Sequence, residues 1–408
     1  MTKKRGALLS GLILCFCTLV FSIEQKSPEW KGKIKQIDGI KVVENPSIPL
    51  NGKLAFNLAE ELRIGNDIDA NQLLNGVREI KIDNEGNIYI LDMRNYRVQV
   101  FDKNGHFLLT IGKKGHGPGE FSFPKAFYID RQSQSIHIAD YLSRKIIVFS
   151  MKGEYLDRDI LMTLNPEKIS FGDKGDIWGV FSEHGYETTR FLKHYNGVGK
   201  ELEIFMEKPY QNSRVMTSKE SMGRNQTRVG GFFFHHGFEY DLYFSKISDE
   251  GLVFGYSDEY VLHFIDGTGE LNQKVTWDAE KEKISRATRD KIKQETRRDM
   301  IRQGTVPPDF DIDFPDYAPF FYGLVSDDEG RIYVQRTSKA EAAVNGYVFD
   351  VLDREGIFIY TVQMDYYPYL IEEGCLYTVI VDDETGTESV VRFRIKNWDR
   401  YNSHHQYP

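Results

Sequence analysis

The sequence contains few cysteines, no excess of positive charge and no long hydrophobic run. Its 408 residues include only three cysteines, which excludes a disulfide-stapled scaffold. Acidic residues outnumber basic ones by 61 to 52 and give a net charge of −9, which argues against nucleic acid as the main partner. With 40% hydrophobic and 28% charged residues, the composition favours a folded protein over a polytopic membrane protein or a disordered chain.

Short catalytic motifs are missing as well. The sequence has no GxSxG nucleophile elbow and no HExxH helix, and no Ser-His-Asp order can be assigned. The glycine-rich stretch 112–119 does not match a GxxxxGKS/T phosphate loop, and strands are expected on both sides of it. We therefore interpret its glycines as tight-turn residues.

Residues 1–22 are predicted to form a secretory signal peptide. A basic start at residues 3–5 precedes an apolar run over 7–20, which is shorter than the ~20 residues of a spanning helix. Cleavage near residue 22, lipidation at Cys15 or Cys17, and an uncleaved anchor all remain open. Without the basic start the chain has 49 basic and 61 acidic residues and a net charge of −12. We expect the protein in the periplasm or cell envelope.

A repeated pattern organises the rest of the sequence. Four short alternating runs, separated by Gly, Asn or Asp turns, fill residues 78–111, and the pattern returns over 127–156. Each unit is typical of a four-stranded antiparallel meander. The equivalent turn positions Gly330 and Gly374 are 44 residues apart, a period that is typical of propeller blades.

Six such units are predicted, and the last one lacks a strand at its C-terminal end. The upstream segment Lys53–Ile64 reads as a strand without a partner. We therefore predict an all-β, six-bladed β-propeller over 53–397, in which this N-terminal segment supplies the outer strand of the last blade. Closing the ring removes exposed sheet edges. Residues 23–52 are then a leader, and 398–408 a polar tail.

Two insertions, over 206–236 and 278–318, fall in the links between blades. Such links lie on the same side of a propeller as the turns between second and third strands, so all the added chain is expected on one side, the insertion-bearing face. Loops on rigid scaffolds carry function. We therefore expect the ligand at this face, with the mouth of the central channel as its pocket.

The second insertion is predicted to contain a helix over 278–303. Ile284, Ile292 and Met300 recur every eight residues, with Ala287 between them. Its many charges favour a solvated lid over a site for an anionic partner. Beyond the helix, four aspartates have a spacing that could hold Ca²⁺, although the glycine and terminal glutamate of an EF-hand loop are missing. These aspartates are Asp309, Asp311, Asp313 and Asp316.

The GPGEF junction Gly117–Phe121, together with Phe101–Gly105 and Ile111–Gly112, resembles the NHL-repeat propellers. With the blade rhythm and the helical insertion, the sequence resembles the bacterial six-bladed β-propeller family that carries a secretion or lipoprotein signal, over residues 45–397. The resemblance implies the fold. It says little about function, because NHL propellers range from binding modules to lyases.

Polar and aromatic residues near turns of the insertion-bearing face are the candidate binding residues. They are Arg94, Asn95, Tyr96, His116, Tyr141, Arg144, His184, Tyr186, His235 and Arg336. Arg and Tyr are frequent interface anchors, but salt bridges and ring stacking between blades would explain the same residues equally well. A metal needs three or four converging ligands, and the histidines of this set leave a divalent metal open as an alternative to a protein without a cofactor.

Three further residues have structural interpretations. Asp92 and Asp140 occupy equivalent positions of two blades and are predicted to cap turns. Cys375 is predicted to be a small buried hydrophobe in a strand. His404 and His405 are expected to be solvated in the tail.

Together these observations predict an exported, monomeric propeller that binds a protein, small-molecule or glycan ligand and has no catalytic residues. Contact with a membrane is expected only through an N-terminal lipid or anchor. Two alternatives stay open. One is a metal-dependent enzyme of the lactonase or lyase type, and the other is a structural component of a cell-envelope complex.

Overall fold

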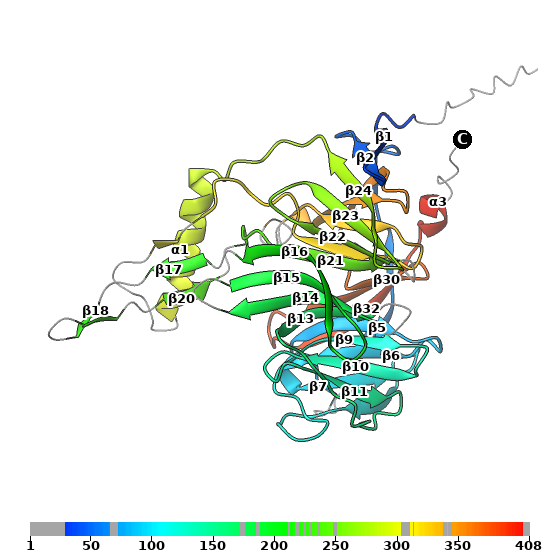
Figure 1. Cartoon of the computed structure of the whole chain (residues 1–408), viewed down its shortest axis with the longest axis vertical. Coiled ribbons are helices and arrows are strands. Elements are labelled where there is room, and N and C mark those ends of the chain that lie inside the picture. The colour runs from blue at the N-terminus through cyan, green and yellow to red at the C-terminus, as the bar shows by residue number, and fades with distance from the viewer. Residues whose placement is uncertain are drawn as a thin grey trace, which may run out of the picture.

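The structure is a computed structural model that describes residues 29–65, 72–171, 176–184, 188–210, 213–216, 220–222, 226–228, 231–234, 237–247, 251–302, 311–312, 314–337, 341 and 345–402. Six units of four antiparallel strands follow one another along the chain as the blades of a propeller, and two of these sheets carry additional strands (Figure 1). In each blade the first strand lies at the inner end of the sheet and the fourth strand lies further out.

The first three blades use consecutive strands of the chain. Blade one contains β5 (Val77–Ile82), β6 (Ile88–Asp92), β7 (Arg97–Phe101) and β8 (Phe107–Ile111), with the short helix η1 (Met93–Asn95) between β6 and β7. Blade two contains β9 (Pro124–Asp130), β10 (Ser135–Asp140), β11 (Lys145–Ser150) and β12 (Ile160–Leu161). Blade three contains β13 (Asn165–Phe171), β14 (Ile177–His184), β15 (Thr188–Tyr195) and β16 (Glu201–Tyr210).

The last three blades complete the ring. Blade four contains β21 (Leu242–Ile247), β22 (Gly251–Tyr256), β23 (Val261–Asp266) and β24 (Leu271–Trp277). Blade five contains β26 (Gly323–Ser326), β27 (Ile332–Gln335), β28 (Tyr347–Leu352) and β29 (Phe358–Met364). Blade six contains β30 (Leu370–Glu372), β31 (Cys375–Val381), β32 (Glu388–Ile395) and, from the N-terminal part of the chain, β4 (Leu58–Ile64).

The strand β4 closes the ring. It pairs antiparallel with β32, so that Arg63 lies opposite Val391 and Ile64 lies opposite Val390. The prediction of a six-bladed propeller with four-stranded antiparallel blades, closed by an N-terminal strand, is therefore confirmed.

The expected single strand Lys53–Ile64 is in fact two strands that belong to different blades. Only β4 joins blade six, whereas β3 (Lys53–Ala55) pairs in parallel with β29 of blade five. The break falls at Phe56, which is buried in the hydrophobic cluster between these two blades. The prediction was too long at its N-terminal end because a buried Phe also fits the alternation of a continuous strand.

The residues predicted as a leader also add strands to the propeller. The hairpin of β1 (Lys33–Ile37) and β2 (Ile40–Asn45) joins blade four through a parallel pairing of β2 with β24. The Asn45 side chain accepts the backbone N–H of Phe358 at 2.8 Å and donates to the carbonyl of Gly356 at 2.8 Å. The N-terminal part of the chain thus lies along the outer edges of blades four, five and six in succession.

The hydrophobic core lies between neighbouring blades. The strand β6 is buried along its whole length. Because successive side chains point to opposite faces, Ile88 and Ile90 pack toward blade six, and Tyr89 and Leu91 pack toward blade two. Cys375 lies in the first of these clusters with an exposed fraction of 4%, as predicted for a small buried residue in a strand.

Two buried carboxylates tie the ends of second strands to the chain that enters their blades. Asp92 accepts the backbone N–H of Asn75 at 2.9 Å and pairs with Arg97 at 2.8 Å. Asp140 accepts the backbone N–H groups of Ser122 and Phe123. Both aspartates are fully buried, and their predicted role in turns is confirmed.

The two insertions lie on one side of the ring and pair with each other. The first contains β17 (Ser213–Met216), β18 (Glu220–Met222), β19 (Gln226–Arg228) and β20 (Gly231–Phe234), and the second contains α1 (Arg286–Arg302) and β25 (Asp311–Ile312). The strand β17 pairs with both β20 and β25. Figure 1 shows α1, β17, β18 and β20 together at the left, beyond the ends of the strands of blade three.

The helix α1 begins later than predicted. The Ser285 hydroxyl accepts the backbone N–H of Thr288 at 3.1 Å and caps the helix, so the predicted start at residue 278 is wrong. Ile284 is buried ahead of the helix, and Ile292 and Met300 are half-buried, while Ala287 is exposed and does not belong to the buried stripe.

The tail predicted as polar begins with a packed helix. In α3 (Trp398–Asn402) the side chain of Tyr401 is fully buried, and its hydroxyl donates to that of Tyr333 at 3.0 Å. The prediction of a polar tail is therefore wrong for residues 398–402, where two aromatic residues cover the junction of blades five and six. The predicted signal peptide and the two tail histidines lie outside the described residues.

Candidate functional site

The inner strands of the first three blades share an irregularity near the insertion-bearing face. In β5, β9 and β13, one residue close to the start of the strand is skipped in the pairing with the second strand, as in a β-bulge. The skipped residues are Arg78, Lys125 and Glu167. Since a bulge re-aims the side chain of its extra residue and is frequent next to functional sites, these three charged side chains indicate a site at the axis of the ring.

Two of the three bulge residues form an ion pair. The ammonium group of Lys125 contacts the carboxylate of Glu167, which also accepts the Ser182 hydroxyl at 2.8 Å. The same ammonium group lies 4.2 Å from the ring centre of Tyr141. Burial lowers the pKa of Lys125 although Glu167 opposes this effect. The positive charges of Lys125 and Arg190 overcome burial and lower the pKa of Glu167.

A second ion pair stands beside the first. The guanidinium group of Arg190, from β15, contacts the carboxylate of Asp241, which directly precedes the inner strand β21. Arg190 also lies 3.9 Å from the ring centre of Tyr210. Burial raises the pKa of Asp241 although Arg190 opposes this effect. Both ion pairs thus place mutually compensating charges at the same end of the axis.

The positive charges of Arg78 and Lys168 lack such a compensating partner. Lys168 donates to the backbone carbonyl of Phe244 at 2.8 Å, and no acidic group of the described residues lies within ion-pair distance of its ammonium group. Burial lowers the pKa of Lys168 to about 8, with Glu79 opposing and Lys81 and Arg78 adding to the shift. Arg78 is exposed, and no hydrogen bond or ion pair joins it to another described residue.

Tyrosines complete this group of side chains. Tyr367 and Tyr369, which lead into β30, pack edge to face with ring centres 5.4 Å apart, and Tyr243 extends from β21. Burial is the main cause of the raised pKa of each, to about 12 for Tyr367, so all three hydroxyls stay protonated at neutral pH. We call the following set the axial cluster: Arg78, Lys125, Glu167, Lys168, Arg190, Asp241, Tyr243, Tyr367 and Tyr369.

Lys168 gives a pH dependence to stability. Its folded-state pKa of about 8 lies below the ordinary lysine value, so between pH 8 and about 10.4 the unfolded chain binds a proton that the folded chain does not. Stability should therefore rise with pH across this window, by an amount on the order of 2 kcal/mol. Urea unfolding at several pH values should show this rise in the wild type relative to Lys168→Met. Lys152→Met, at an exposed turn, should leave it intact, and a rise that survives in Lys168→Met would contradict the assignment.

The opposite end of the axis has a different character. The Lys246 ammonium group donates to the Tyr128 hydroxyl at 3.2 Å, and the hydroxyls of Ser245 and Ser326 are 2.9 Å apart. Arg131 and Glu372 face each other at 3.7 Å. Lys246 and Arg131 therefore both have partners at this end. The positive charges without an acidic partner, Arg78 and Lys168, lie toward the insertion-bearing face.

The predicted site residues of blade one form the turn between β6 and β7. Arg94 donates to the Asn75 side chain at 3.4 Å, and Asn95 donates to the carbonyl of Leu73 at 3.1 Å. Tyr96 has a φ of 57°. The ammonium group of Lys114 lies 4.9 Å from the centre of the Tyr96 ring. These contacts support a structural role for the turn.

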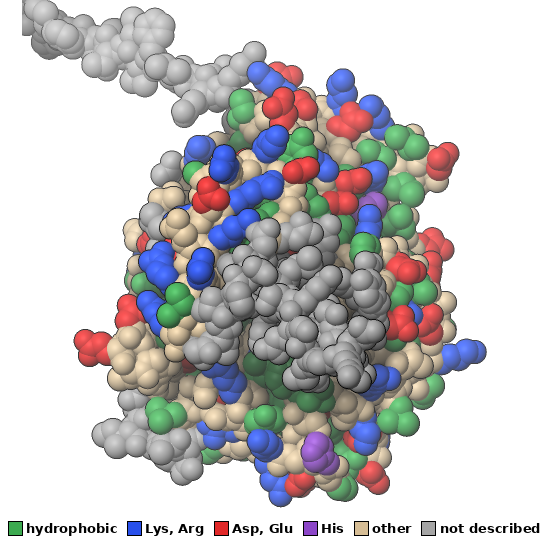
Figure 2. All heavy atoms as spheres, turned by 90° about the vertical axis from the view of Figure 1, so that its left-hand side faces the viewer, with side chains coloured by type: hydrophobic (Ala, Val, Ile, Leu, Met, Phe, Trp, Pro, Cys, Tyr) green, Lys and Arg blue, Asp and Glu red, His purple; other side chains and the backbone are tan. Residues whose placement is uncertain are grey.

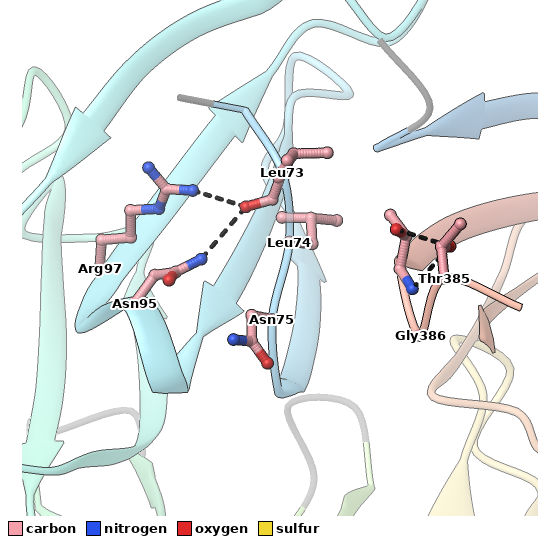
Figure 3. Close-up of a pocket in the computed structure, with 8 residues that line it drawn as sticks. Leu73, Leu74, Asn75, Asn95, Arg97, Thr385 and Gly386 are labelled. Atoms are coloured by element: carbon pink, nitrogen blue, oxygen red, sulfur yellow. Dashed lines mark hydrogen bonds between the residues drawn. The ribbon is translucent and has the colours of Figure 1, made fainter. Parts of the chain in front are cut away.

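This turn borders an open pocket of about 520 Å³ between blades six and one (Figure 3). Its lining residues are Leu73, Leu74, Asn75, Asn95, Arg97, Thr385, Gly386 and Thr387. Asn95 and Arg97 both donate to the carbonyl of Leu73 (Figure 3). Since its strongest donors are already used within the protein, the pocket is a weaker candidate than the axial cluster.

The remaining predicted residues are dispersed. His116 bonds with the Ser122 hydroxyl at 2.8 Å in the glycine-rich loop, and Arg144 is an exposed turn residue with a φ of 54°. Arg336 pairs with Asp350 at 2.7 Å and packs on the ring of Tyr260, between blades four and five. Of the ten predicted residues, Tyr141 is the one that contacts the axial cluster directly through a described side chain.

The metal alternatives receive no support from the described residues. Tyr186, His235, Asp309 and Asp313 lie outside them, and the side chains of His184 and Asp311 are likewise not described. Asp316 lies 3.5 Å from the guanidinium group of Arg289. Across the described part of the chain, no group of three or more His, Cys, Asp or Glu could hold a metal ion.

The glycine-rich stretch 112–119 forms turns, as predicted. Gly112 and Gly119 have positive φ values of 74° and 69°. A Cβ atom on Gly115 would lie 1.9 Å from the carboxylate of Glu120, which accepts the backbone N–H of Gly117 at 2.9 Å. The Glu120 carboxylate therefore fills the space beside Gly115.

The insertion-bearing face carries positive charge on an otherwise acidic protein. The helix α1 contains seven Lys or Arg and three Asp or Glu residues. Figure 2, which looks onto this face, shows Lys and Arg side chains gathered beside the undescribed residues. The sequence favours a solvated lid for this helix, and its exposed Lys291, Arg297 and Arg298 are consistent with a solvated outer surface.

The repeated blades and their closure define a six-bladed β-propeller. The sequence profile of the family DUF5128, described as a 6-bladed beta-propeller, matches residues 69–288. The chain belongs to this family. No curated protein sequence matches the chain.

The first of the solved structures compared with the chain agrees with it in fold. A Bacteroides fragilis protein whose name marks it as predicted to be exported has a TM-score of 0.52 at 12% identity, covering 87% of this chain and 99% of its own. A DUF4221 member from Bacteroides vulgatus has a TM-score of 0.46 at 12% identity, covering 84% and 99%. Virginiamycin B lyase from Staphylococcus aureus reaches 0.40 at 13% identity, covering 83% and 99%. Among the described residues, none of the helices has the length and apolarity to cross a membrane.

Proposed function

We propose that the chain is an exported binding module that holds its ligand at the axial cluster on the insertion-bearing face. One observation carries the proposal. Three consecutive inner strands are interrupted near the same end, and each interruption presents a charged side chain, Arg78, Lys125 or Glu167. A bulge disrupts its ladder locally, so its occurrence in three blades at one end points to a use of the presented side chains.

The proposal includes a location outside the cytoplasm. The basic start and the apolar run of the first 22 residues support export to the periplasm or cell envelope, either free or held by an N-terminal lipid. The ligand is a small molecule, a glycan or a segment of a protein that reaches the axis past the two insertions. A propeller suits this role because its rigid ring fixes the loops that surround the axis.

A ligand screen with matched variants tests the proposal. The purified protein would be screened by thermal shift against a library of metabolites and oligosaccharides, and each hit would be repeated on Tyr243→Ala and Arg131→Ala. We expect the hits to be weakened about tenfold or more in Tyr243→Ala and unchanged in Arg131→Ala, because Arg131 lies at the opposite end of the axis.

Two outcomes would contradict the proposal. Hits that respond only to Arg131→Ala would move the binding site to the other face. A hit that mass spectrometry recovers as a cleaved or eliminated product would replace a binding module with an enzyme of the lactonase or lyase type.

A further inference from the structure

We infer that the axial cluster binds the anionic group of a small polar molecule, a carboxylate or a phosphate, between Arg78 and Lys168. The inference rests on the proposed function and specifies the chemistry of its ligand. It depends on the distribution of charge, on the bulge at Arg78 and on the tyrosines around it.

The charges of the cluster do not cancel. Lys125 is paired with Glu167, and Arg190 is paired with Asp241. Two further acids lie close to the cluster. The Glu79 carboxylate accepts the backbone N–H of Phe127 at 2.9 Å and lies 4.0 Å from the ammonium group of Lys81, and the Glu388 carboxylate accepts the backbone N–H of Val77 at 2.6 Å.

Two cations of the cluster are therefore left over. Arg78 forms no hydrogen bond or ion pair with another described residue, and Lys168 bonds only to a neutral carbonyl. Lys168 is partly buried, and a partly buried cation without an anion is costly, whereas the exposed Arg78 is open to a ligand from solvent. A bound anion would supply the missing partner for both.

Arg78 is placed to reach the middle of the ring. Its charge contributes to lowering the pKa values of Lys125 and Lys168, on blades two and three, and also acts on Tyr367 and Tyr369, which lead into blade six. The bulge at the start of β5 re-aims the Arg78 side chain, and these interactions agree with a guanidinium group near the axis. The side chain is exposed, so a ligand that enters along the axis meets its planar fork of donors, which matches a carboxylate or phosphate.

The tyrosines give the site its specificity for a polar molecule. The hydroxyls of Tyr243, Tyr367 and Tyr369 form no hydrogen bond that joins them to another described residue. Because burial raises their pKa values, they remain hydrogen-bond donors at neutral pH. Their rings offer apolar surface to the body of the ligand, and their hydroxyls can bond to its polar groups.

The electrostatic potential of the insertion-bearing face favours the approach of an anion. Without its basic start the chain carries a net charge of −12, yet α1 on the insertion-bearing face carries a net excess of four basic residues. A positive region around a binding site raises the local concentration of anions and their association rate, and salt screens this effect. Binding should therefore weaken as ionic strength increases.

Calorimetric titration with a matched set of probes tests the inference. Glucuronate carries a carboxylate that glucose lacks. Inorganic phosphate is the probe for a ligand whose anionic group is a phosphate. We expect glucuronate or phosphate to bind and glucose not to bind. The anion that binds more tightly shows whether the ligand carries a carboxylate or a phosphate. Arg78→Gln and Lys168→Gln should each weaken anion binding about tenfold or more, whereas Arg131→Gln should not. Circular dichroism should show that all three variants are folded.

Each contrary result has a distinct meaning. If no anion binds, or if anions bind equally well to Arg78→Gln and Lys168→Gln, the inference is overturned while the proposed function stands for a neutral ligand. If glucose binds as tightly as glucuronate and Tyr243→Ala weakens both, the proposed site is supported and its anion specificity is wrong. If anions bind and only Arg131→Gln weakens them, both proposals fail together.

Discussion

Replacement of Asp327 by alanine should destabilise the protein by about 3–5 kcal/mol. Asp327 is 3% exposed and pairs with Arg331, which is 1% exposed, at 2.6 Å. It also accepts the Tyr333 hydroxyl at 3.0 Å. Removing the carboxylate leaves a buried guanidinium group without its closest counter-charge, and this loss costs far more than a pair is worth at the surface.

The site of this pair explains why the effect is large. The guanidinium group of Arg331 lies 4.5 Å from the ring centres of both Trp398 and Tyr401 in the C-terminal helix α3. These rings cover the guanidinium group from water, and after the loss of Asp327 its ion pair with Glu329 at 3.2 Å offers weaker compensation, because the Glu329 side chain is 42% exposed. The pair thus couples blade five to the end of the chain.

Urea unfolding would measure the effect, with Glu44→Ala as the control. Glu44 forms an ion pair with Lys35 at 2.6 Å, but the side chains are 38% and 48% exposed, and the expected cost is about 1 kcal/mol or less. The double variant Asp327→Leu with Arg331→Met should recover much of the loss, since apolar side chains of similar volume often replace a buried ion pair without penalty. Equal losses in Asp327→Ala and Glu44→Ala would show that Arg331 finds other compensation.

The sequence predicted the ring well because blades repeat. Turn residues recur at a nearly constant period, and each repeat can bury its faces only against neighbouring repeats. Asp92 and Asp140 could be assigned to turns because they occupy the same place in two blades. The same logic required an extra strand for blade six.

The path of the N-terminal segment could not be predicted in detail. The hairpin at residues 33–45 and the strand β3 join blades four and five through parallel pairings, and these depend on contacts across more than 200 residues of chain. The helix α3 was missed because its burial depends on Arg331 and Tyr333, which are distant in sequence. Local polarity around residue 400 gives no sign of this contact.

The axial cluster was missed for a related reason. The sequence directed attention to the turns, whereas the unpaired charges lie at the starts of inner strands. One signal was present. Arg78 and Lys125 each stand five residues before an aspartate at the end of the first strand: Asp83 directly follows β5, and Asp130 is the last residue of β9. A basic residue at the same place in two blades is unusual for strands buried in a ring. Arg78 and Lys125 are also the bulge residues of these strands, so together the two features indicate a site at the axis.

Removal of the closing strand should prevent the protein from remaining a folded monomer. A chain that starts at Gly65 lacks β4 and leaves the outer edge of β32 unpaired along Val390–Ile395. It also loses the packing of Leu62 and Ile64 against the cluster between blades six and one. An exposed strand edge next to apolar surface promotes association between chains, so size-exclusion chromatography should show aggregates.

A chain that starts at Phe56 is the matched control. It keeps β4 and the contacts of Phe56 with Trp398 and Tyr401, and it loses only β1, β2 and β3. It should elute as a folded monomer of reduced stability, because the outer additions to blades four and five are gone while the ring is still closed. In the full chain, Ile64→Asp should reproduce the aggregation, since it places a charge at a position that is 4% exposed. Similar elution of the chains that start at Phe56 and Gly65 would mean that blade six holds the ring together without its fourth strand.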